Sequence, residues 1–495
     1  MAWVDLGLPP GLLRRGTAHQ SKGRWFEQTL VRWYEGAMRP IGGWLARTTT
    51  PMSGKCRAMV TWRDNVTTRF IALGTHTNLY ALTQTSATPV DITPVGFTTG
   101  RADATFGAGY GVGPYGASTY GTPRIDNVSV QDASMWVLDT DGQDLVGVMS
   151  DDGKLYEWLR NTSVKAVATT GAPSNNSAVV VTPERFVMLL GANGVSRRCQ
   201  WADQEVRTTW TATSTNQAGD YDIQSQGKLM CGLRLRTSTL IFTDLDAHMA
   251  TYVGLPYVYR FDRIGDACGI ISRGAAAAHE SRAMWMGTNG FFLYDGTVRL
   301  VPCDVWDEVF KDINITQRSK VVAMTNATFS EVWWFYPSAA STENDKYVTY
   351  NIQEDHWNVG QLSRLACVDA GVFNNPLMVD ASGYVYDHET GSSYTGAAVT
   401  TPFATSAPIE MGVGERIAKV RELVPDEDTL GQVQVSFLVA DSPTGSETTY
   451  GPYTPAAITP VRFAGRQARM KVQFVSPTNA KWGNPRLDVV AGGRR

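Results

Sequence analysis

The chain has 495 residues, a length that suggests two or three domains unless one of them is a large all-β unit. Hydrophobic residues make up 43% and charged residues 18%, which excludes a wholly disordered chain. The 47 Gly, 15 Trp, 19 Tyr and 17 Phe favour many short strands joined by tight turns, and no apolar run of about 18 residues would span a membrane.

Charge is divided unevenly along the chain. Residues 1–50 carry seven Lys and Arg against three Asp and Glu, and residues 405–495 carry eleven against nine. The middle region, 51–404, holds 26 basic against 35 acidic residues. A protein that grips nucleic acid needs a basic face to neutralise phosphates. Tight DNA binding by the middle region is therefore disfavoured.

The N-terminal segment, residues 1–50, is rich in arginine and tryptophan. Side chains of these two types can stack on nucleic acid bases, and they are also enriched where proteins contact one another. We expect this segment to form an interface or to close the β-domain that follows it. The interleaved residues are Arg24, Trp25, Arg32, Trp33, Arg39 and Trp44.

Residues 51–400 contain a series of small β-units, each with an apolar strand, a Gly or Asn turn, and a strand bearing an aromatic residue. The aromatic markers lie 36 to 76 residues apart, a loose version of the one-blade period of a β-propeller, about 40 to 50 residues. We therefore predict an all-β, β-propeller-like domain of six or seven blades, with a long β-sandwich or a β-solenoid as the alternative. The markers are Tyr80, Tyr156, Trp201, Phe242, Tyr294, Tyr350 and Tyr386.

The widest interval contains a Gly- and Tyr-rich stretch, residues 106–121. Its glycine spacing is similar to a dinucleotide-binding fingerprint, but Pro114 and further glycines follow where a helix would have to begin. We predict instead a long, flexible loop whose tyrosines contact a protein partner. These tyrosines are Tyr110, Tyr115 and Tyr120.

Two later patterns complete the fold prediction. Residues 303–313 have apolar side chains at helical spacing, with Asp304 placed to cap a helix. After Thr400 the pattern changes to strict alternation, as in 468–474, which is typical of half-buried antiparallel strands. We predict a separate C-terminal β-sandwich domain over 405–495, ending in a loose basic tail.

The sequence offers no recognisable catalytic constellation. None of the six histidines has a partner at metal-binding spacing, and the paired carboxylates lie among Gly, Ser and Thr in turn-like positions. The six cysteines are isolated, which favours free thiols in a reducing cytoplasm. We therefore expect no catalytic residues, no metal site and no cofactor, and a protein that is not an enzyme.

Three stretches resemble the tail hub, or nozzle, proteins of short-tailed bacteriophages, a family also described as packaged DNA stabilization proteins. In the first stretch, residues 14–44, the shared features are Arg15-Gly16-Thr17, Gly23-Arg24-Trp25, Leu30-Val31-Arg32-Trp33 and Arg39-Pro40-Ile41-Gly42-Gly43-Trp44. The second stretch is 331–366, and the third comprises 451–455, 462–474 and 486–495. Together they include both ends of the chain.

The resemblance implies a structural virion protein of the phage tail, assembled in the host cytoplasm. Such proteins form a ring, commonly six-fold, below the portal and its adaptor ring. They line the DNA exit channel, retain the packaged genome and carry fibres, spikes or a needle. Double-stranded DNA would pass only transiently, and this chain would not insert into a membrane. The expected subunit or adaptor contacts are Arg15, Arg24, Trp25, Arg32, Trp33, Arg39, Trp44, Tyr110, Tyr115 and Tyr120.

Two other functions remain open at this stage. A propeller of this size is also compatible with a phage protein that binds or depolymerises carbohydrate, which would require a cleft with two carboxylates about 5 to 9 Å apart. A monomeric scaffold propeller that binds other proteins is the second alternative.

Overall fold

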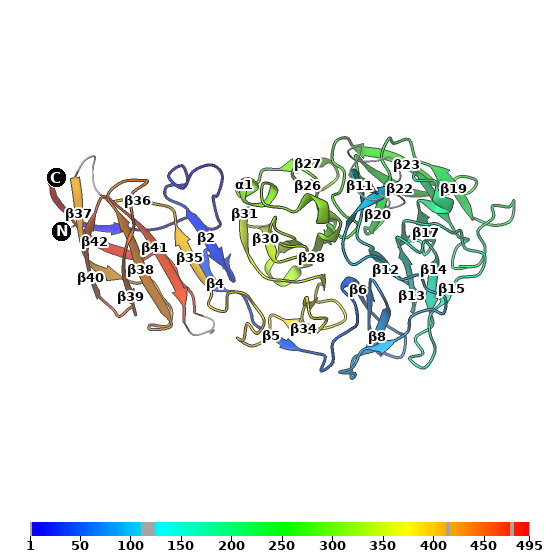
Figure 1. The fold of residues 1–495 in the computed structure, drawn as a ribbon, viewed down its shortest axis with the longest axis horizontal. Coiled ribbons are helices and arrows are strands. Elements are labelled where there is room, and N and C mark those ends of the chain that lie inside the picture. Colours follow the sequence, from blue (N-terminus) through cyan, green and yellow to red (C-terminus); the bar gives the residue numbers. More distant parts are fainter. Residues whose placement is uncertain (1, 110–123, 412–415, 476–479, 495) are drawn as a thin grey trace.

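The computed structural model describes residues 2–109, 124–411, 416–475 and 480–494, which form two β-domains side by side along the long axis of the molecule (Figure 1). One domain is a β-propeller and the other a β-sandwich, as predicted. The helical content of the described residues is one short α-helix, α1 (Trp306–Phe310), and three 3-10 turns, η1 (Ala192–Gly194), η2 (Ile315–Lys320) and η3 (Ala327–Phe329).

The propeller has seven blades, each a four-stranded antiparallel sheet in the described residues. Blade 1 consists of β6 (Cys56–Arg63), β7 (Arg69–Thr75), β8 (Leu79–Thr83) and β9 (Val90–Asp91). Blade 2 consists of β12 (Trp136–Asp141), β13 (Asp144–Met149), β14 (Leu155–Trp158) and β15 (Val167–Ala168). Blade 3 consists of β16 (Ala178–Val181), β17 (Val187–Leu190), β18 (Arg198–Trp201) and β19 (Gly219–Asp222).

Blades 4 to 7 repeat this arrangement. Blade 4 consists of β20 (Leu229–Arg234), β21 (Thr239–Thr243), β22 (Ala247–Gly254) and β23 (Val258–Gly265), and blade 5 of β24 (Ala276–His279), β25 (Arg282–Met286), β26 (Phe291–Tyr294) and β27 (Val298–Val301). Blade 6 consists of β28 (Val322–Asn326), β29 (Glu331–Tyr336), β30 (Lys346–Asn351) and β31 (His356–Gln361). Blade 7 consists of β32 (Ala366–Val368), β33 (Leu377–Val379) and β34 (Val385–His388), and β5 (Trp44–Ala46) is its fourth strand.

The first strands of the blades form the inner ring of the propeller. Each of β6, β12, β16, β20, β24, β28 and β32 contacts the next, and β32 contacts β6 again. Each of the seven marker aromatics lies in a different blade. The local pattern of strand, turn and aromatic therefore corresponds to one blade each time, because a blade is a set of consecutive antiparallel hairpins.

Blade 7 is closed by a strand from the N-terminal segment. Strand β5 pairs antiparallel with β34, with Trp44 opposite His388. The Trp44 indole is buried, and its Nε1 donates to the Thr395 carbonyl at 2.8 Å. The outer strand of blade 7 thus comes from the opposite end of the repeat, and this pairing ties the two ends of the propeller together.

The sandwich draws strands from both ends of the chain. Two of them, β1 and β2, come from the N-terminal segment, whereas the sequence predicted a domain built from 405–495 alone. The predicted loose tail is also wrong, since residues 486–494 form β42. One sheet contains β1 (Ala2–Asp5), β42 (Arg486–Arg494), β37 (Arg416–Val424) and β40 (Thr459–Gly465). The other contains β2 (Trp25–Thr29), β35 (Phe403–Ser406), β41 (Gln467–Phe474), β38 (Val433–Ala440), β39 (Thr448–Tyr453) and β36 (Ile409–Glu410).

The predicted alternation in this domain is confirmed. Met470 and Val472 of β41 are fully buried, as are Val433 and Val435 of β38. These side chains meet the buried side chains of the facing sheet, so each sheet hides one face from water.

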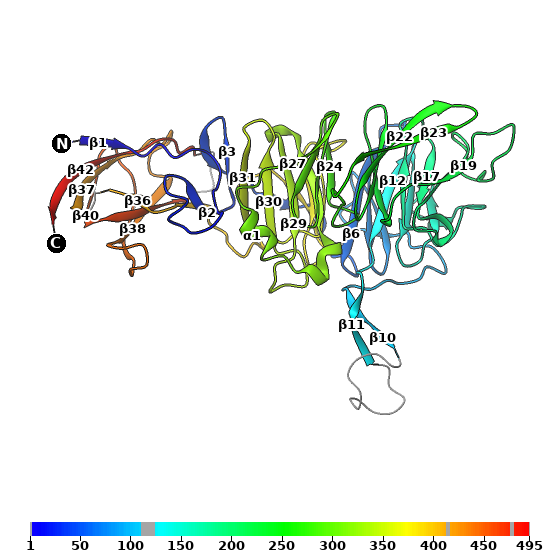
Figure 2. The same cartoon turned by 90° about the horizontal axis from the view of Figure 1, so that it is seen from above.

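Two hairpins stand outside the sheets. The first, β3 (Val31–Tyr34) with β4 (Ala37–Pro40), lies between the sandwich and the propeller. The second, β10 (Thr105–Gly109) with β11 (Arg124–Gln131), projects from one face of the propeller (Figure 2). The predicted loop at 106–121 thus begins as a strand, and its tyrosines Tyr110, Tyr115 and Tyr120 lie outside the described residues.

The predicted helix at 303–313 is shorter than expected. Strand-like and turn residues flank α1, and no side chain caps its N-terminus at Val305. Asp304, the expected cap, instead lies 3.6 Å from the Arg24 guanidinium. An ion pair with the N-terminal segment has replaced the local cap, a tertiary contact that helical spacing alone does not reveal.

Candidate functional site

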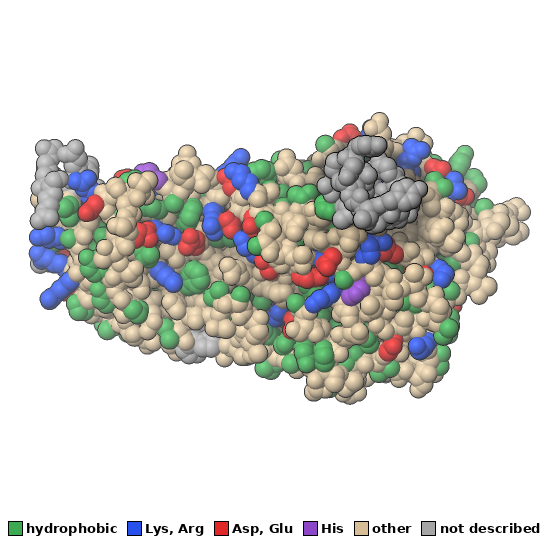
Figure 3. Space-filling view, in the orientation of Figure 1, with side chains coloured by type: hydrophobic (Ala, Val, Ile, Leu, Met, Phe, Trp, Pro, Cys, Tyr) green, Lys and Arg blue, Asp and Glu red, His purple; other side chains and the backbone are tan. Residues whose placement is uncertain are grey.

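The face from which the β10–β11 hairpin projects carries a cluster of charged side chains near the propeller axis. Figure 3 shows acidic and basic side chains gathered on this face. The inner strand of every blade begins at this face. Segment 101–104, which leads into β10, lies on the same face. We call Arg57, Asp103, Lys320 and Glu343 the axial cluster.

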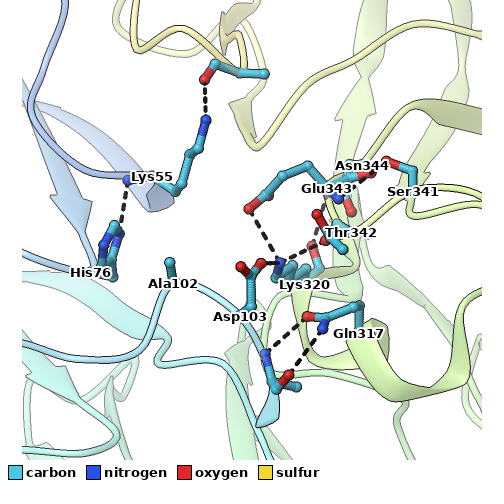
Figure 4. Close-up of polar contacts among 12 residues, drawn as sticks. Lys55, His76, Ala102, Asp103, Gln317, Lys320, Ser341, Thr342, Glu343 and Asn344 are labelled. Carbon is cyan, nitrogen blue, oxygen red and sulfur yellow. Dashed lines mark hydrogen bonds and ion pairs between the residues drawn. The ribbon is translucent and has the colours of Figure 1, made fainter.

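The axial cluster joins blades 1 and 6 to the hairpin base. Both Arg57 terminal nitrogens donate to the Glu343 carboxylate at 2.7 Å, a bidentate pair. Lys320 Nζ lies 2.5 Å from an Asp103 oxygen and 3.2 Å from Glu343 Oε1 (Figure 4). The side chains of Arg57 and Lys320 are 1% and 0% exposed. Such deeply buried cations require these partners, because an unpaired buried charge is very costly.

Main-chain contacts complete the attachment of the hairpin. Arg57 Nη2 donates to the Ala102 carbonyl at 2.6 Å. The Gln317 side chain accepts from the Ala104 amide at 2.9 Å and donates to the Ala104 carbonyl at 3.1 Å (Figure 4). Arg101 pairs with Asp151 of blade 2 at 2.8 Å. The base of the projecting hairpin is therefore fixed to blades 1, 2 and 6.

His76 lies beside the axial cluster. Its Nδ1 accepts from the Lys55 main-chain amide at 2.9 Å, and Lys55 Nζ donates to the Ala381 carbonyl of blade 7 (Figure 4). Burial and the nearby positive charge of Arg57 lower the pKa of His76. The ring is thus neutral at physiological pH, with its proton on Nε2.

The pKa of Glu343 reports the balance of charge in the cluster. Burial alone would raise the pKa of this carboxyl, but the hydrogen bonds and positive charges of Arg57 and Lys320 hold it below its ordinary value. The glutamate is ionised at neutral pH and acts as the shared counterion of both cations.

Other blades also place a cation close to the start of the inner strand. Arg273 donates to the Ser177 carbonyl of blade 3 at 3.2 Å, and burial lowers its pKa. Lys228 lies 3.8 Å from Asp132. Arg364 is buried between Trp44 and Tyr386, and burial lowers its pKa to about 10. The axial face therefore carries charges of both signs, since carboxylates of Asp103, Asp132 and Glu343 lie beside these cations.

The structure corrects the expected interface role for four residues of the N-terminal segment. Trp25, Trp33 and Trp44 are 3%, 2% and 1% exposed, and Arg32 is 1% exposed. Trp33 packs against Trp25 and His356. These side chains lie in the chain's own core and present no surface to a partner, because the basic segment is folded between the two domains.

Arg32 belongs to a second buried cluster of charges, which we call the junction cluster, with Glu331 and Glu389. Its Nη2 lies 3.0 Å from Glu331 Oε2 and 2.6 Å from Glu389 Oε1, and its guanidinium stacks on Phe329 at 3.7 Å from the ring centre. The two carboxylates raise the pKa of Arg32 despite its burial, whereas burial raises the pKa of Glu331. A cavity of about 780 Å³ opens beside this cluster.

The remaining predicted contact residues lie nearer the surface. Arg15 is exposed, and Arg24 and Arg39 are half-buried. Arg39 donates to the Tyr34 carbonyl at 3.1 Å and lies 3.4 Å from Glu35. Of the predicted set within the described residues, Arg15 is thus the side chain best placed to reach a partner.

The described residues contain no group of three or more His, Cys, Asp or Glu that would hold a metal ion. Within the same part of the chain, no helix is long and apolar enough to cross a membrane.

Comparison with known proteins defines a fold class but no family. No protein-family model and no curated protein matches the chain. Among solved structures, virginiamycin B lyase from Staphylococcus aureus is similar, with 8% identity, a TM-score of 0.43, and coverage of 70% of this chain and 97% of that one. A streptogramin B lyase structure has 7% identity, a TM-score of 0.41, and coverage of 69% and 94%. The extracellular domain of a one-component system from B. thetaiotaomicron has 11% identity, a TM-score of 0.36, and coverage of 73% and 40%.

These similarities agree with the β-propeller fold and correct one expectation. The prediction that the protein is not an enzyme is contradicted, because two of these propellers are lyases by name. At such low identity no activity, substrate or site residue carries over to this chain.

Proposed function

We propose that this protein is a tail hub, or nozzle, subunit of a short-tailed bacteriophage that assembles into a ring. The observation that carries the proposal is that parts of all three resembling stretches meet in the folded chain. Residues 14–44, 331–366 and 462–474 are far apart in the sequence but adjacent at the junction between propeller and sandwich (Figure 1).

Specific contacts join these stretches. Gln28 Nε2 donates to the Val359 carbonyl at 2.5 Å, and the Leu30 amide donates to the Tyr347 hydroxyl at 3.0 Å. Arg469 of the third stretch lies 3.4 Å from Glu27. The third stretch also reaches β39 and β42 of the sandwich, so the resemblance extends over both domains, as expected for a shared two-domain subunit.

The charge distribution is compatible with transient passage of DNA. The acidic balance of residues 51–404 opposes a strong grip on phosphates. Segment 101–104 and the axial cluster bridge blades on one face of the propeller, so we place the DNA path in the bore of the ring and not along the propeller axis. The projecting hairpin and Arg15 are the proposed contacts with neighbouring subunits or the adaptor ring.

The mass of the purified full-length protein tests this proposal. Native mass spectrometry and negative-stain microscopy should show a closed ring, with six-fold symmetry favoured, alone or after addition of the adaptor protein. A single-chain mass under both conditions would contradict the proposal and favour a monomeric scaffold.

Point variants are better suited to mapping the contact than deletion of the N-terminus, since residues 1–50 supply β1, β2 and β5. Arg15→Glu should weaken ring formation, whereas Arg263→Glu, an exposed arginine of β23, is the matched control. Equal effects of both variants would remove Arg15 from the contact.

DNA binding supplies an independent measurement. At physiological salt, isolated rings should bind duplex DNA with Kd no tighter than about 10⁻⁴ to 10⁻⁶ M, the range of non-specific contacts. Nanomolar binding in a gel-shift titration would contradict a channel through which DNA passes freely.

A further inference from the structure

An aromatic groove lies between the outer strands of blades 3 and 4, on the side of the propeller away from the sandwich (Figures 1 and 2). Its volume is about 660 Å³, within the range of about 300 to 1,000 Å³ typical of small-molecule sites. Strand β19 forms one wall, and the β22–β23 turn and β23 form the other. We define the aromatic groove by Trp201, Tyr221, Tyr257, Tyr259 and Phe261, with Asp220 and Arg260 at its rim.

The floor of the groove is preorganised. Trp201 and Tyr259 pack edge to face with ring centres 5.3 Å apart. The polar atoms of both rings are occupied inside the protein: Trp201 Nε1 donates to the Gln217 carbonyl at 2.8 Å, and the Tyr259 hydroxyl lies 2.7 Å from the Thr182 hydroxyl. Trp201 and Tyr259 are 3% and 6% exposed, so they form a fixed base under the groove, and the ring surface open to a ligand belongs to Tyr221, Tyr257 and Phe261.

The upper part of the groove exposes aromatic surface to water. Tyr257 is 79% exposed and Tyr221 is 41% exposed, and Leu255 and Val253 on the same turn are 66% and 47% exposed. The Tyr221 and Phe261 rings stack in parallel with centres 5.0 Å apart. Large apolar side chains gathered at one exposed place, around a concave site, are a recognised mark of a binding surface.

The charges at the rim narrow the class of ligand. Asp220 and Arg260 are both more than half exposed, and their carboxylate and guanidinium can turn toward a ligand. Arg260 pairs with Asp262 at 2.7 Å, and Arg198 pairs with Asp222 at 2.8 Å and lies 3.6 Å from Asp220. The charged residues that line the groove, Asp220 and Arg260, have opposite signs, so the rim is close to neutral and offers no concentration of positive charge to a phosphate-bearing nucleotide.

We propose that the aromatic groove binds a neutral saccharide. A sugar ring offers an apolar C–H face that packs on an aromatic side chain and hydroxyl groups at its edge that bond to charged rim residues. A protein partner would need roughly 800 Å² of matching surface on each side, whereas the groove is a local concavity between two strands. The proposal does not depend on ring formation or on a tail function.

A glycan array of neutral oligosaccharides and polysaccharides, probed with the full-length protein, identifies the ligand. Isothermal titration calorimetry with the best-binding oligosaccharide then compares variants. We expect Tyr257→Ala to weaken binding about tenfold or more through loss of one stacked ring. Tyr257→Phe should retain most of the affinity because it keeps the ring. Leu300→Ala, at an apolar residue of blade 5 that is 61% exposed, should leave binding unchanged.

Three results would overturn the proposal. The first is an array with no neutral glycan bound. The second is glycan binding that Tyr257→Ala leaves unchanged. The third is loss of oligomeric mass in Tyr257→Ala, which would make the groove a contact between copies. A monomeric protein that binds glycan through Tyr257 would refute the proposed ring and leave this inference intact.

Discussion

The axial cluster places one glutamate between two cations, whereas the junction cluster places one arginine between two glutamates. Both clusters are buried, and both join segments that are far apart in the sequence. In the first, the cations outweigh burial and the pKa of Glu343 falls. In the second, burial outweighs the single cation and the pKa of Glu331 rises. Glu343 has two cations beside it, whereas Glu331 has one cation and a second carboxylate, Glu389, and this difference accounts for the opposite directions of the two pKa shifts.

The two clusters also hold different parts of the molecule. The axial cluster fixes the hairpin to the propeller face, and part of it reaches solvent, since the Asp103 side chain is 48% exposed. The junction cluster joins β3 of the N-terminal hairpin to blades 6 and 7. Arg32 and Glu331 are 2% and 1% exposed, and Glu389, which is 19% exposed, borders the cavity. Removal of the cation should be more damaging at the junction, because the 1% exposed Glu331 relies on Arg32, whereas Glu343 keeps a second cation when one is removed.

The largest expected effect is that of Arg32→Met. This change leaves the buried Glu331 and the half-buried Glu389 without their shared cation, and it should lower the free energy of unfolding by about 3–5 kcal/mol. Denaturant titration of the full chain, followed by tryptophan fluorescence, measures the loss. Arg39→Met is the control, because its partner Glu35 is 69% exposed and its loss should cost about 1 kcal/mol or less. Equal losses would refute a special role for the junction cluster.

Lys320→Met should have a smaller effect. The change leaves Glu343 paired with Arg57, and Asp103 can be hydrated, so the expected loss is about 1–3 kcal/mol. Lys311→Met provides the comparison, since Lys311 is 66% exposed and pairs with Asp307 on the surface. A loss as large as that of Arg32→Met would show that the axial cluster is as closed to water as the junction cluster.

Folding shifts the pKa values of Glu343 and Glu331 in opposite directions, so the contributions of these two glutamates to stability should depend on pH in opposite ways. The pKa of Glu343 is lowered by folding, so its stabilisation is complete above the pKa of the unfolded chain and is lost as pH falls through the folded value. The pKa of Glu331 is raised, so its contribution to stability falls as pH rises from the unfolded to the folded value. A folded pKa that differs from the unfolded pKa by one pH unit changes stability by about 1.4 kcal/mol.

Unfolding curves between pH 3 and pH 7 test this difference. Glu343→Gln should reduce the loss of stability on acidification, because its acid-sensitive contribution is gone. Glu331→Gln should make acidification more damaging relative to the wild type. The same direction of change in both variants would refute the contrast between the clusters.

Local patterns predicted the blades but not the contacts between distant segments. Tyr80 and Tyr386 mark blades because strand, turn and aromatic follow one another within a few residues. Nothing near Trp25 or Arg32 indicates that these residues pair with segments about 300 positions away. Their residue types are also typical of exposed interfaces, so the sequence alone placed them on the surface.

The axial cluster was missed for a similar reason. Arg57 and Lys320 lie next to apolar strands. A cation in that position indicates the end of a strand but does not indicate which acidic side chain pairs with it. The partner Glu343 lies 286 residues after Arg57. The starts of strands β6 and β28 come together on one face only because the blades close into a ring. The order of the blades depends on the whole repeat and not on the sequence near either strand.

The smallest expected effect is that of Gln317→Ala at the hairpin base. The substitution removes both hydrogen bonds to Ala104 but leaves the axial ion pairs, so global stability should fall by only about 1 kcal/mol. The local effect should be larger, since the Ala104 amide loses its acceptor. Amide exchange in a peptide that covers 101–106 should become about tenfold faster, equivalent to about 1.4 kcal/mol of local opening. Gln361→Ala, at an exposed glutamine at the end of β31, should leave this peptide unchanged. Unchanged exchange in Gln317→Ala would mean that the ion pairs of the axial cluster hold the hairpin base without help from the Gln317 hydrogen bonds. Only the charges of the axial cluster would then distinguish it from the junction cluster.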